Sequence, residues 1–372
     1  MRKKLLFLIP NLKHGGAEKV LVNLVNNLDT EKYDITVQTL FNEGVHRDGL
    51  KKHIRYIPGF RKSFRGNSAL VKLFPAKLLW KLLVKEHYDI AVSYLEGPTT
   101  RILSGCTDPD TKLVAWLHIE LNSPKLASMG FRSPAEAESA YNRFHRIVAV
   151  SGNVRDCFLN NLSVQTPVDI LYNTNETEEI LQKALEKPND PAFRPEDGVC
   201  VCSVAKLMKT KGFDRLLRVH KQLLDEGLDH HLYILGIGEE QTALDRQMQE
   251  LGITDSVTLL GFRKNPYAYV ARCDLYVCSS HREGFSTAVT EALVVGTPVI
   301  STQCSGAKEL LGESDVYGLV VENSEAGIYQ GMKRMLSDPA LLEHYRSMAK
   351  IRGQFFSKEK TVLAVEEMFD SL

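Results

Sequence analysis

Short, nearly continuous apolar runs alternate along the chain with segments in which apolar residues recur every three or four positions. Continuous runs predict strands buried on both faces, and therefore parallel sheets with helices on each side. The clearest helical spacing covers residues 17–28. The predicted strands form two series, 5–9, 35–40, 90–94, 113–117, 147–150 and 168–171, followed by 199–204, 231–235, 257–260, 275–277 and 298–301.

A polar, proline-bearing stretch at residues 173–197 separates the two series. We interpret it as a linker with one short helix over 178–187. The fold class is therefore α/β with two Rossmann-like domains, 1–172 and 173–356. The last segment, 357–372, has amphipathic spacing and begins with Ser357, a residue type favoured at a helix N-cap.

Composition sets the broad class of the protein. The chain has 372 residues, 44% of them hydrophobic and 25% charged, which is typical of a globular protein with room for two domains. Its formal net charge is zero, so no overall field favours nucleic acid, and no nucleic-acid partner is expected.

The cysteines and the N-terminus indicate a cytoplasmic protein. Seven cysteines lack C-x2-C spacing, so neither zinc nor a disulfide framework is expected, and reduced thiols fit a cytoplasm. Residues 1–10 resemble a signal peptide, but their apolar run is too short and a small-residue cleavage site does not follow. We interpret this run as the first strand. No run approaches the roughly 18 apolar residues of a spanning helix.

The most informative motif covers residues 283–291, EGFSTAVTE. It follows the strand at 275–277, so Glu283 falls in a loop and Glu291 in the helix after it. Ligands bind at such loops because unpaired amides point outward there. A carboxylate can accept two hydrogen bonds from a vicinal diol, as a sugar or ribose offers. Read alone, two glutamates at this spacing are better explained as solvated acids on a surface loop and helix.

The surroundings of this motif extend it into an ordered series. Downstream lies EALVVGTPVI at 291–300, and upstream lie GFR at 261–263 and SVAKLMKTKGFD at 203–214. GGAE at 15–18 and AVS at 149–151 continue it into the N-terminal half. The series resembles the retaining glycosyltransferases of family 4, which have the GT-B fold. In that fold two Rossmann-like domains face each other across a deep cleft, and the last helix crosses back to the first domain.

The resemblance implies an acceptor-binding domain, 1–172 with 357–372, and a donor-binding domain, 173–356. It implies that Glu291 binds the ribose hydroxyls and that Glu283 positions the donor sugar through a hydroxyl. The backbone near Phe262 would border the base, and the amides after Glu283 would approach the diphosphate. The remaining donor-binding residues it implies are Gly261, Arg263, Gly284, Phe285, Ser286 and Thr287.

A glycosyltransferase must stabilise the leaving nucleoside diphosphate. Lys206 and Lys211 follow the first strand of the second domain, where ammonium groups can meet phosphate oxygens, although solvated lysines are the competing interpretation. The family usually has Arg at the position of Lys206. The lysine keeps the positive charge but cannot form the two parallel hydrogen bonds that a guanidinium makes to a phosphate. The only Asp-x-Asp pair, Asp108 and Asp110, has a surface-turn composition. We therefore expect no metal site and no cofactor.

In the first domain the resemblance points to one glycine pair and one histidine. Gly15 and Gly16 lie between the first strand and the first helix, where their amides would approach an anion. His118 ends the strand 113–117 and matches the active-site histidine that contacts the donor sugar. No carboxylate nucleophile stands out, so the resemblance implies a same-face displacement. Where the family often has Asn-Gly at the hinge, this chain has Asn173 and Thr174.

The acceptor side carries a basic segment at residues 51–85, in which 70–85 alternates apolar residues and lysines at helical spacing. Basic amphipathic segments bind anionic bilayers, but an ordinary helix with lysines facing water fits as well. A glycan acceptor on polyprenyl diphosphate would suit both the basic charge and a membrane surface. We expect peripheral association with the inner face of the cytoplasmic membrane.

The sequence as a whole predicts a metal-independent, retaining glycosyltransferase. It would move a hexose-type sugar from a nucleotide sugar, with a UDP-sugar expected, to a glycan in bacterial envelope, capsular or O-antigen polysaccharide synthesis. Two alternatives stay open: a soluble sugar or sugar-phosphate acceptor, and a catalytically degenerate sugar-nucleotide binding protein. An NAD enzyme is disfavoured because Gly236 and Gly238 lack a third glycine.

Overall fold

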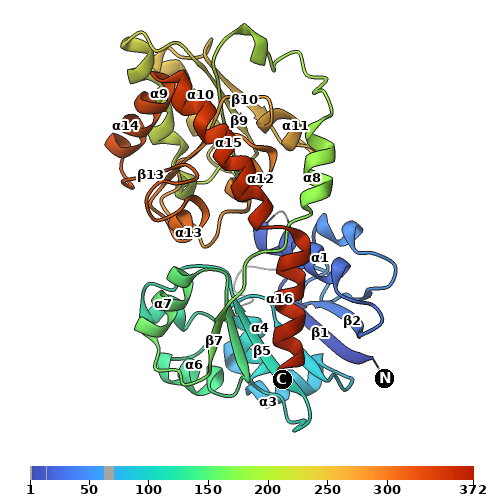
Figure 1. The fold of residues 1–372 in the computed structure, drawn as a ribbon. Coiled ribbons are helices and arrows are strands. Elements are labelled where there is room, and N and C mark those ends of the chain that lie inside the picture. Colours follow the sequence, from blue (N-terminus) through green and yellow to red (C-terminus); the bar gives the residue numbers. More distant parts are fainter. Residues whose placement is uncertain (1, 14, 63–70) are drawn as a thin grey trace. The chain divides into compact units, whose positions relative to one another are not determined.

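The computed structural model describes residues 2–13, 15–62 and 71–372. The chain forms two compact units (Figure 1). One comprises Met1–Asn175 with Lys358–Leu372, and the other comprises Glu176–Ser357. The chain therefore leaves the first unit once and returns to it with its last helix.

The first unit is built on a seven-stranded parallel sheet with the strand order β3-β2-β1-β4-β5-β6-β7. Its central strands are buried apolar runs, which need cover on both faces. The strands are β1 Lys3–Ile9, β2 Tyr33–Thr39, β3 Arg55–Ile57, β4 Ile90–Ser93, β5 Lys112–Leu117, β6 Arg146–Ala149 and β7 Val168–Ile170.

Helices cover this sheet, and the last helix of the chain belongs to it. The ring of Phe369, in that helix, meets Phe7 and Tyr33 edge-on with centroids 6.2 and 6.0 Å apart. This packing confirms the predicted return of the last helix. The helices of the first unit are α1 Gly16–Asn27, α3 Ala76–Leu83, α4 Pro98–Leu103, α5 Pro124–Ala127, α6 Pro134–Tyr141, α7 Gly152–Asn161 and α16 Lys358–Asp370.

The second unit repeats the plan with a six-stranded parallel sheet, in the order β10-β9-β8-β11-β12-β13. Its strands are β8 Cys200–Val204, β9 His231–Leu235, β10 Val257–Gly261, β11 Leu275–Cys278, β12 Val299–Thr302 and β13 Leu319–Val321. Its α-helices are α8 Thr177–Ala184, α9 Phe213–Asp225, α10 Gln241–Leu251, α11 Tyr267–Val270, α12 Thr287–Val295, α13 Ala307–Leu311, α14 Glu325–Leu336 and α15 Pro339–Phe355.

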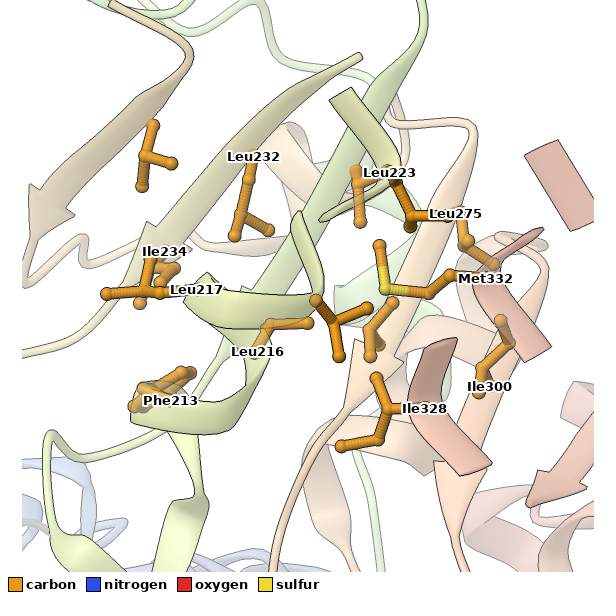
Figure 2. Packing of buried hydrophobic residues seen from close by; sticks show 14 of the residues in the cluster. Phe213, Leu216, Leu217, Leu223, Leu232, Ile234, Leu275, Ile300, Ile328 and Met332 are labelled. Carbon is orange, nitrogen blue, oxygen red and sulfur yellow. The ribbon is translucent and has the colours of Figure 1, made fainter. Parts of the chain in front are cut away.

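The core of the second unit lies between the sheet and helices α9 and α14 (Figure 2). Leu216 of α9 and Met332 of α14 are fully buried in one cluster with Leu232, Leu275 and Ile300 from three strands. Burial of such side chains contributes about 1.5–3 kcal/mol each, so this cluster fixes the sheet that carries the candidate site.

Every predicted strand is present, and the two unpredicted strands, β3 and β13, are three-residue edge strands. Three residues are shorter than the runs that stand out as strands in a sequence. The prediction of one helix over 70–85 is wrong. Residues 71–73 are helical, Pro75 interrupts the helix, and α3 begins at Ala76. Residues 63–70 of the predicted basic segment lie outside the described residues.

Each sheet has a point at which the strand order reverses. In the first unit it lies between β1 and β4, and in the second between β8 and β11. Ligands bind parallel α/β sheets at the carboxyl ends of the strands beside such a point. The loops after these four strands are therefore where a site is expected, and most of the predicted site residues lie in them or at the start of the following helix.

Candidate functional site

The loop after β8 carries the two predicted lysines. It ends in a short 3-10 turn, Lys209–Lys211, and Gly212 then takes a left-handed conformation, with φ of 65°, before α9 begins. An added Cβ at Gly212 would lie 2.2 Å from the carbonyl oxygen of Ser279, so only glycine permits this approach. The turn is thereby held against the loop that follows β11.

Lys211 and Glu283 meet at this point. Nζ of Lys211 donates to Oε1 of Glu283 at 2.6 Å, and the Ser280 hydroxyl donates to the same oxygen at 2.6 Å. Burial disfavours the ammonium charge, but attraction and a hydrogen bond from Glu283 outweigh it and raise the pKa of Lys211. The site thus holds a fixed cation and a fixed carboxylate in contact.

Arg215, which was not among the residues predicted from the sequence, anchors the loop after β11. Its buried guanidinium donates twice to the Ser279 carbonyl, at 3.0 and 2.6 Å, and once to Oδ1 of Asn323 at 2.7 Å. The Ser279 hydroxyl in turn donates to the carbonyl oxygen of Lys211. A charged residue among the buried positions of α9 was the available signal, because a buried cation requires dedicated partners.

Helix α12 starts within the motif. Ser286 is its N-cap, and its hydroxyl accepts the amide of Val289, while Thr287 is the first helical residue. Phe285 is buried, and its ring meets Phe356 edge-on at 5.7 Å, so only the backbone at this position can face a ligand. Glu291 is buried within α12, which rules out the interpretation of two solvated acids.

The three residues predicted to border the base, Gly261, Phe262 and Arg263, differ in their contacts. Gly261 ends β10 at an irregular register, and the side chain of Phe262 is exposed at that edge. Arg263 pairs with Asp190 at 2.6 Å and also donates to the hydroxyl of Tyr269. Its guanidinium therefore ties β10 to the segment before β8, and the base contact of the 261–263 backbone remains a prediction.

Lys206 lies on the exposed surface of the loop after β8 and, among the residues the structure describes, makes no ion pair. It is not brought into the contact that joins Lys211 and Glu283. Its predicted role at the diphosphate remains a prediction.

His118 follows β5 in the first unit and is buried. Burial, partly opposed by a hydrogen bond with the Tyr94 backbone, lowers the pKa of His118 to about 3, so the imidazole is neutral. Its Nε2 has no hydrogen-bond partner within the described chain. The Tyr94 ring lies 4.8 Å from the imidazole, centroid to centroid. A buried, unpartnered ring nitrogen at the carboxyl edge of a sheet fits a ligand-facing histidine.

The glycine pair lies at the start of α1. Gly15 is the N-cap position and Gly16 the first helical residue. The amide of Gly15 donates to the carbonyl of Lys13, and the Glu18 carboxylate lies where a Cβ on Gly15 would be. The Gly15 amide is therefore already engaged, and the anion contact is a prediction for Gly16.

The Asp108 and Asp110 pair forms a turn rather than a ligand set. Oδ2 of Asp108 lies 2.6 Å from Nδ1 of His87, and its other oxygen accepts the amide of Asp110. Within residues 2–13, 15–62 and 71–372, no cluster of three or more His, Cys, Asp or Glu side chains could hold a metal ion.

Comparison with known proteins gives two family matches. The family described as glycosyl transferases group 1 matches residues 186–352, and the glycosyltransferase family 4 model matches residues 14–179.

Individual relatives match over nearly the whole chain. N-acetylgalactosamine-N,N'-diacetylbacillosaminyl-diphospho-undecaprenol 4-alpha-N-acetylgalactosaminyltransferase of Campylobacter jejuni is 30% identical, over 96% of this chain and 97% of that protein. The lipopolysaccharide core biosynthesis glycosyltransferase LpsD of Rhizobium meliloti is 23% identical, over 96% and 95%. The crystal structure of Anabaena HepE with UDP and glucose has a TM-score of 0.80 at 21% identity, with 100% of both chains covered. This likeness confirms the predicted GT-B fold class.

Proposed function

Because the chain belongs to the group 1, or family 4, glycosyltransferases, it is a glycosyltransferase, and we propose that it transfers a hexose-type sugar from a UDP-sugar. The transfer retains the anomeric configuration, needs no metal, and delivers the sugar to a lipid-linked glycan in bacterial envelope polysaccharide synthesis. The observation that carries this proposal is the contact between Lys211 and Glu283 at the strand reversal of the second unit.

The two members of this contact have complementary tasks. The Lys211 ammonium has three donors, so it can keep its bond to Glu283 and still bind an oxygen of the leaving diphosphate. Glu283, fixed by Lys211 and Ser280, can accept a hydroxyl of the donor sugar. Fixed charges of this kind stabilise the transition state because they need no reorganisation when the bond breaks. Glu291 would hold the ribose.

The neutral state of His118 fits a sugar contact rather than a phosphate contact. A neutral imidazole exchanges one hydrogen bond with a hydroxyl and adds no positive charge. In the same-face displacement that we propose, the departing diphosphate accepts the proton of the acceptor hydroxyl. Glu283 then acts by position and forms no bond to the sugar.

The lipid-linked acceptor is supported by the surface of α3. Leu73, Phe74, Leu78 and Leu82 are 69, 46, 42 and 55% exposed; Leu78 and Leu82 lie four residues apart on one side of α3, and Leu73 and Phe74 just precede the helix. The exposed lysines 77, 81 and 85 recur at the same interval beside Leu78 and Leu82 and have no acidic partner among the described residues. We call these side chains, Leu73 to Lys85, the α3 surface. The helix has the form of an interfacial anchor.

Buried polar contacts fix the segment that precedes α3. Arg101, which is 1% exposed, donates to the carbonyl of Phe74 at 3.0 Å and pairs with Glu136 at 2.8 Å. Arg132 donates to the carbonyls of Lys72 and Leu73. The apolar residues are thus presented on a fixed support, as a bilayer contact requires. Among the described helices, none has both the length and the apolar content of a membrane span.

The relative from Campylobacter jejuni is named for transfer to a diphospho-undecaprenol glycan, which supports the same acceptor class here. The test is calorimetry with UDP, GDP, ADP and their sugar conjugates in the presence of EDTA, followed by transfer to a polyprenyl-diphosphate-linked disaccharide. Binding of UDP and its sugars, with transfer in EDTA, is expected. Binding of no nucleotide by the folded protein would overturn the proposal.

A further inference from the structure

A short pattern around the donor motif occurs a second time in the chain. Residues 280–287 read SHREGFST, and residues 93–100 read SYLEGPTT. Ser, Glu, Gly and the last Thr coincide, and Thr99 stands where Ser286 does. Glu96 is thus the counterpart of Glu283 in sequence.

The two copies also occupy equivalent places in the fold. The first follows β4 and the second follows β11, and each of these strands borders the reversal of strand order in its own sheet. β4 pairs with β1 as β11 pairs with β8. Ligands of parallel α/β sheets bind at this position. Glu96 therefore lies at the binding edge of the first unit, as Glu283 lies at that of the second.

The turn that carries Glu96 is rigid. The Ser93 hydroxyl lies 3.0 Å from the hydroxyls of Thr99 and Thr100, and all of these groups are buried. Gly97 has φ of 97° and ψ of −121°, a conformation that side-chain-bearing residues rarely adopt. Glycine adopts this mirror image of the β conformation readily, so Gly97 sets the direction in which the chain leaves Glu96.

Glu96 differs from Glu283 in having no cation beside it. Its Oε2 accepts the amide of His118 at 2.9 Å, and it makes no ion pair with any residue that the structure describes. It is only 7% exposed, and burial raises its pKa to about 7 despite hydrogen bonds from the amides of His118 and of Glu96 itself. Its two oxygens have more lone pairs than these two amides use, so the carboxyl can accept further donors.

A buried ring nitrogen without a partner in the described chain lies on the next strand end. His118, whose amide bonds to Glu96, is 8% exposed and has a ring Nε2 without a partner in the described chain. The unpartnered imidazole nitrogen, next to a buried carboxyl at the ends of the neighbouring strands β4 and β5, indicates a polar occupant, since buried polar groups in native proteins are satisfied.

We infer that Glu96 binds a hydroxyl or N-acetyl N–H of the acceptor sugar, so that the turn 93–100 serves the acceptor as the turn 280–287 serves the donor. This inference rests on the proposed function. A carboxylate accepts strong, directional hydrogen bonds from such groups, which fixes the orientation of the attacking sugar. The charged donor diphosphate does not suit this position because, among the residues that the structure describes, no cation pairs with Glu96.

The test compares Glu96→Gln with Glu138→Gln. Glu96 accepts the amide of His118 and Glu138 that of Ser163, both at 2.9 Å, so Glu138→Gln controls for loss of a carboxylate that bonds a backbone amide. The glutamine oxygen can still accept the amide of His118. The readouts are the KM for a polyprenyl-diphosphate-linked disaccharide of N-acetylated hexosamines, the Kd for UDP, and the slow release of UDP from the donor without acceptor.

Glu96→Gln is expected to raise the acceptor KM by about tenfold or more, while the UDP Kd and acceptor-free UDP release stay within about twofold of wild type. Glu138→Gln should change none of them. A folded Glu96→Gln protein with wild-type acceptor KM, or with UDP binding weakened as much as acceptor binding, overturns the inference. Wild-type protein that binds no nucleotide would instead contradict the proposed function.

Discussion

Nζ of Lys211 lies 2.6 Å from Oε1 of Glu283, and both side chains are largely shielded from water. The pair joins the turn after β8 to the loop after β11, so the two loops that flank the strand reversal form one charged unit. The contact thereby holds the cation that we propose for the diphosphate against the carboxylate that we propose for the donor sugar.

Replacing Glu283 separates the two roles of this pair. Glu283→Ala should lower transfer by at least about 100-fold because the donor sugar loses its positioning contact, while the Kd for UDP changes little. Glu283→Ala should also lower the free energy of unfolding by about 1–3 kcal/mol, because Lys211 loses its ion-pair partner. This range lies between the contributions of exposed and of buried ion pairs. Transfer assays, calorimetry and urea unfolding measure these effects.

The control for stability is Glu325→Ala, which breaks the exposed pair with Arg218 at 2.7 Å. It should cost less than about 1 kcal/mol. If Glu283→Ala transferred sugar at the wild-type rate, the assignment of Glu283 to the active site would be wrong.

Replacing Glu291 should act on the nucleotide instead. Glu291→Ala is expected to weaken UDP binding by about tenfold or more, because a carboxylate bonded to ribose hydroxyls contributes about 1.5–3 kcal/mol. Calorimetric titration with UDP checks this, with exposed Glu250→Ala as the control. Unchanged UDP affinity in a folded Glu291→Ala protein would contradict the ribose assignment.

The α3 surface should be required for binding to anionic vesicles. Each lysine near such a surface contributes about 1 kcal/mol, and the exposed apolar side chains add burial in the interface. Leu78→Glu with Leu82→Glu should abolish sedimentation with phosphatidylglycerol vesicles and leave the Kd for UDP unchanged. Binding of the wild type to phosphatidylcholine vesicles should be weaker.

A matched control exists on α8 and its C-terminal end, where Leu181 and Leu185 are also four residues apart and are 50 and 80% exposed. Changing both to Glu should leave vesicle binding intact. Failure of the wild type to bind anionic vesicles would favour a soluble acceptor.

A buried histidine pair should make stability depend on pH. Nδ1 of His220 lies 2.8 Å from Nε2 of His230, and Nε2 of His220 lies 2.9 Å from the hydroxyl of Ser256. Burial lowers the pKa of His220 to about 3 and also lowers that of His230. Unfolded histidines titrate near about 6.5, so below that pH the unfolded chain binds more protons than the folded one.

Stability should therefore fall as the pH drops from 7.5 to 5, by up to about 1.4 kcal/mol per pH unit for each histidine. The midpoint of urea unfolding measures this loss. His220→Gln should flatten the dependence, and His53→Gln, at an exposed position, should not. An equal slope in His220→Gln and wild type would show that the pair does not titrate on unfolding.

The local pattern was sufficient for most of the fold. Buried strands and amphipathic helices differ in periodicity, so the order of elements and both sheets could be predicted. It failed where local signals are weak, as at β3, or where one residue interrupts a pattern, as Pro75 does before α3. The resemblance to a known family, in both halves of the chain, supplied the candidate site residues.

The sequence by itself determined which residues could carry chemistry, because carboxylates, lysines and glycines at loop positions are readable from order and type. Only the tertiary structure decided which of them meet. It joined Lys211 to Glu283, engaged Arg263 with Asp190, and buried Glu96 against the amide of His118 without a cation. The reason is physical: hydrogen bonds, burial and charge depend on distances between residues far apart in sequence, and those distances are set only when the strands assemble into sheets.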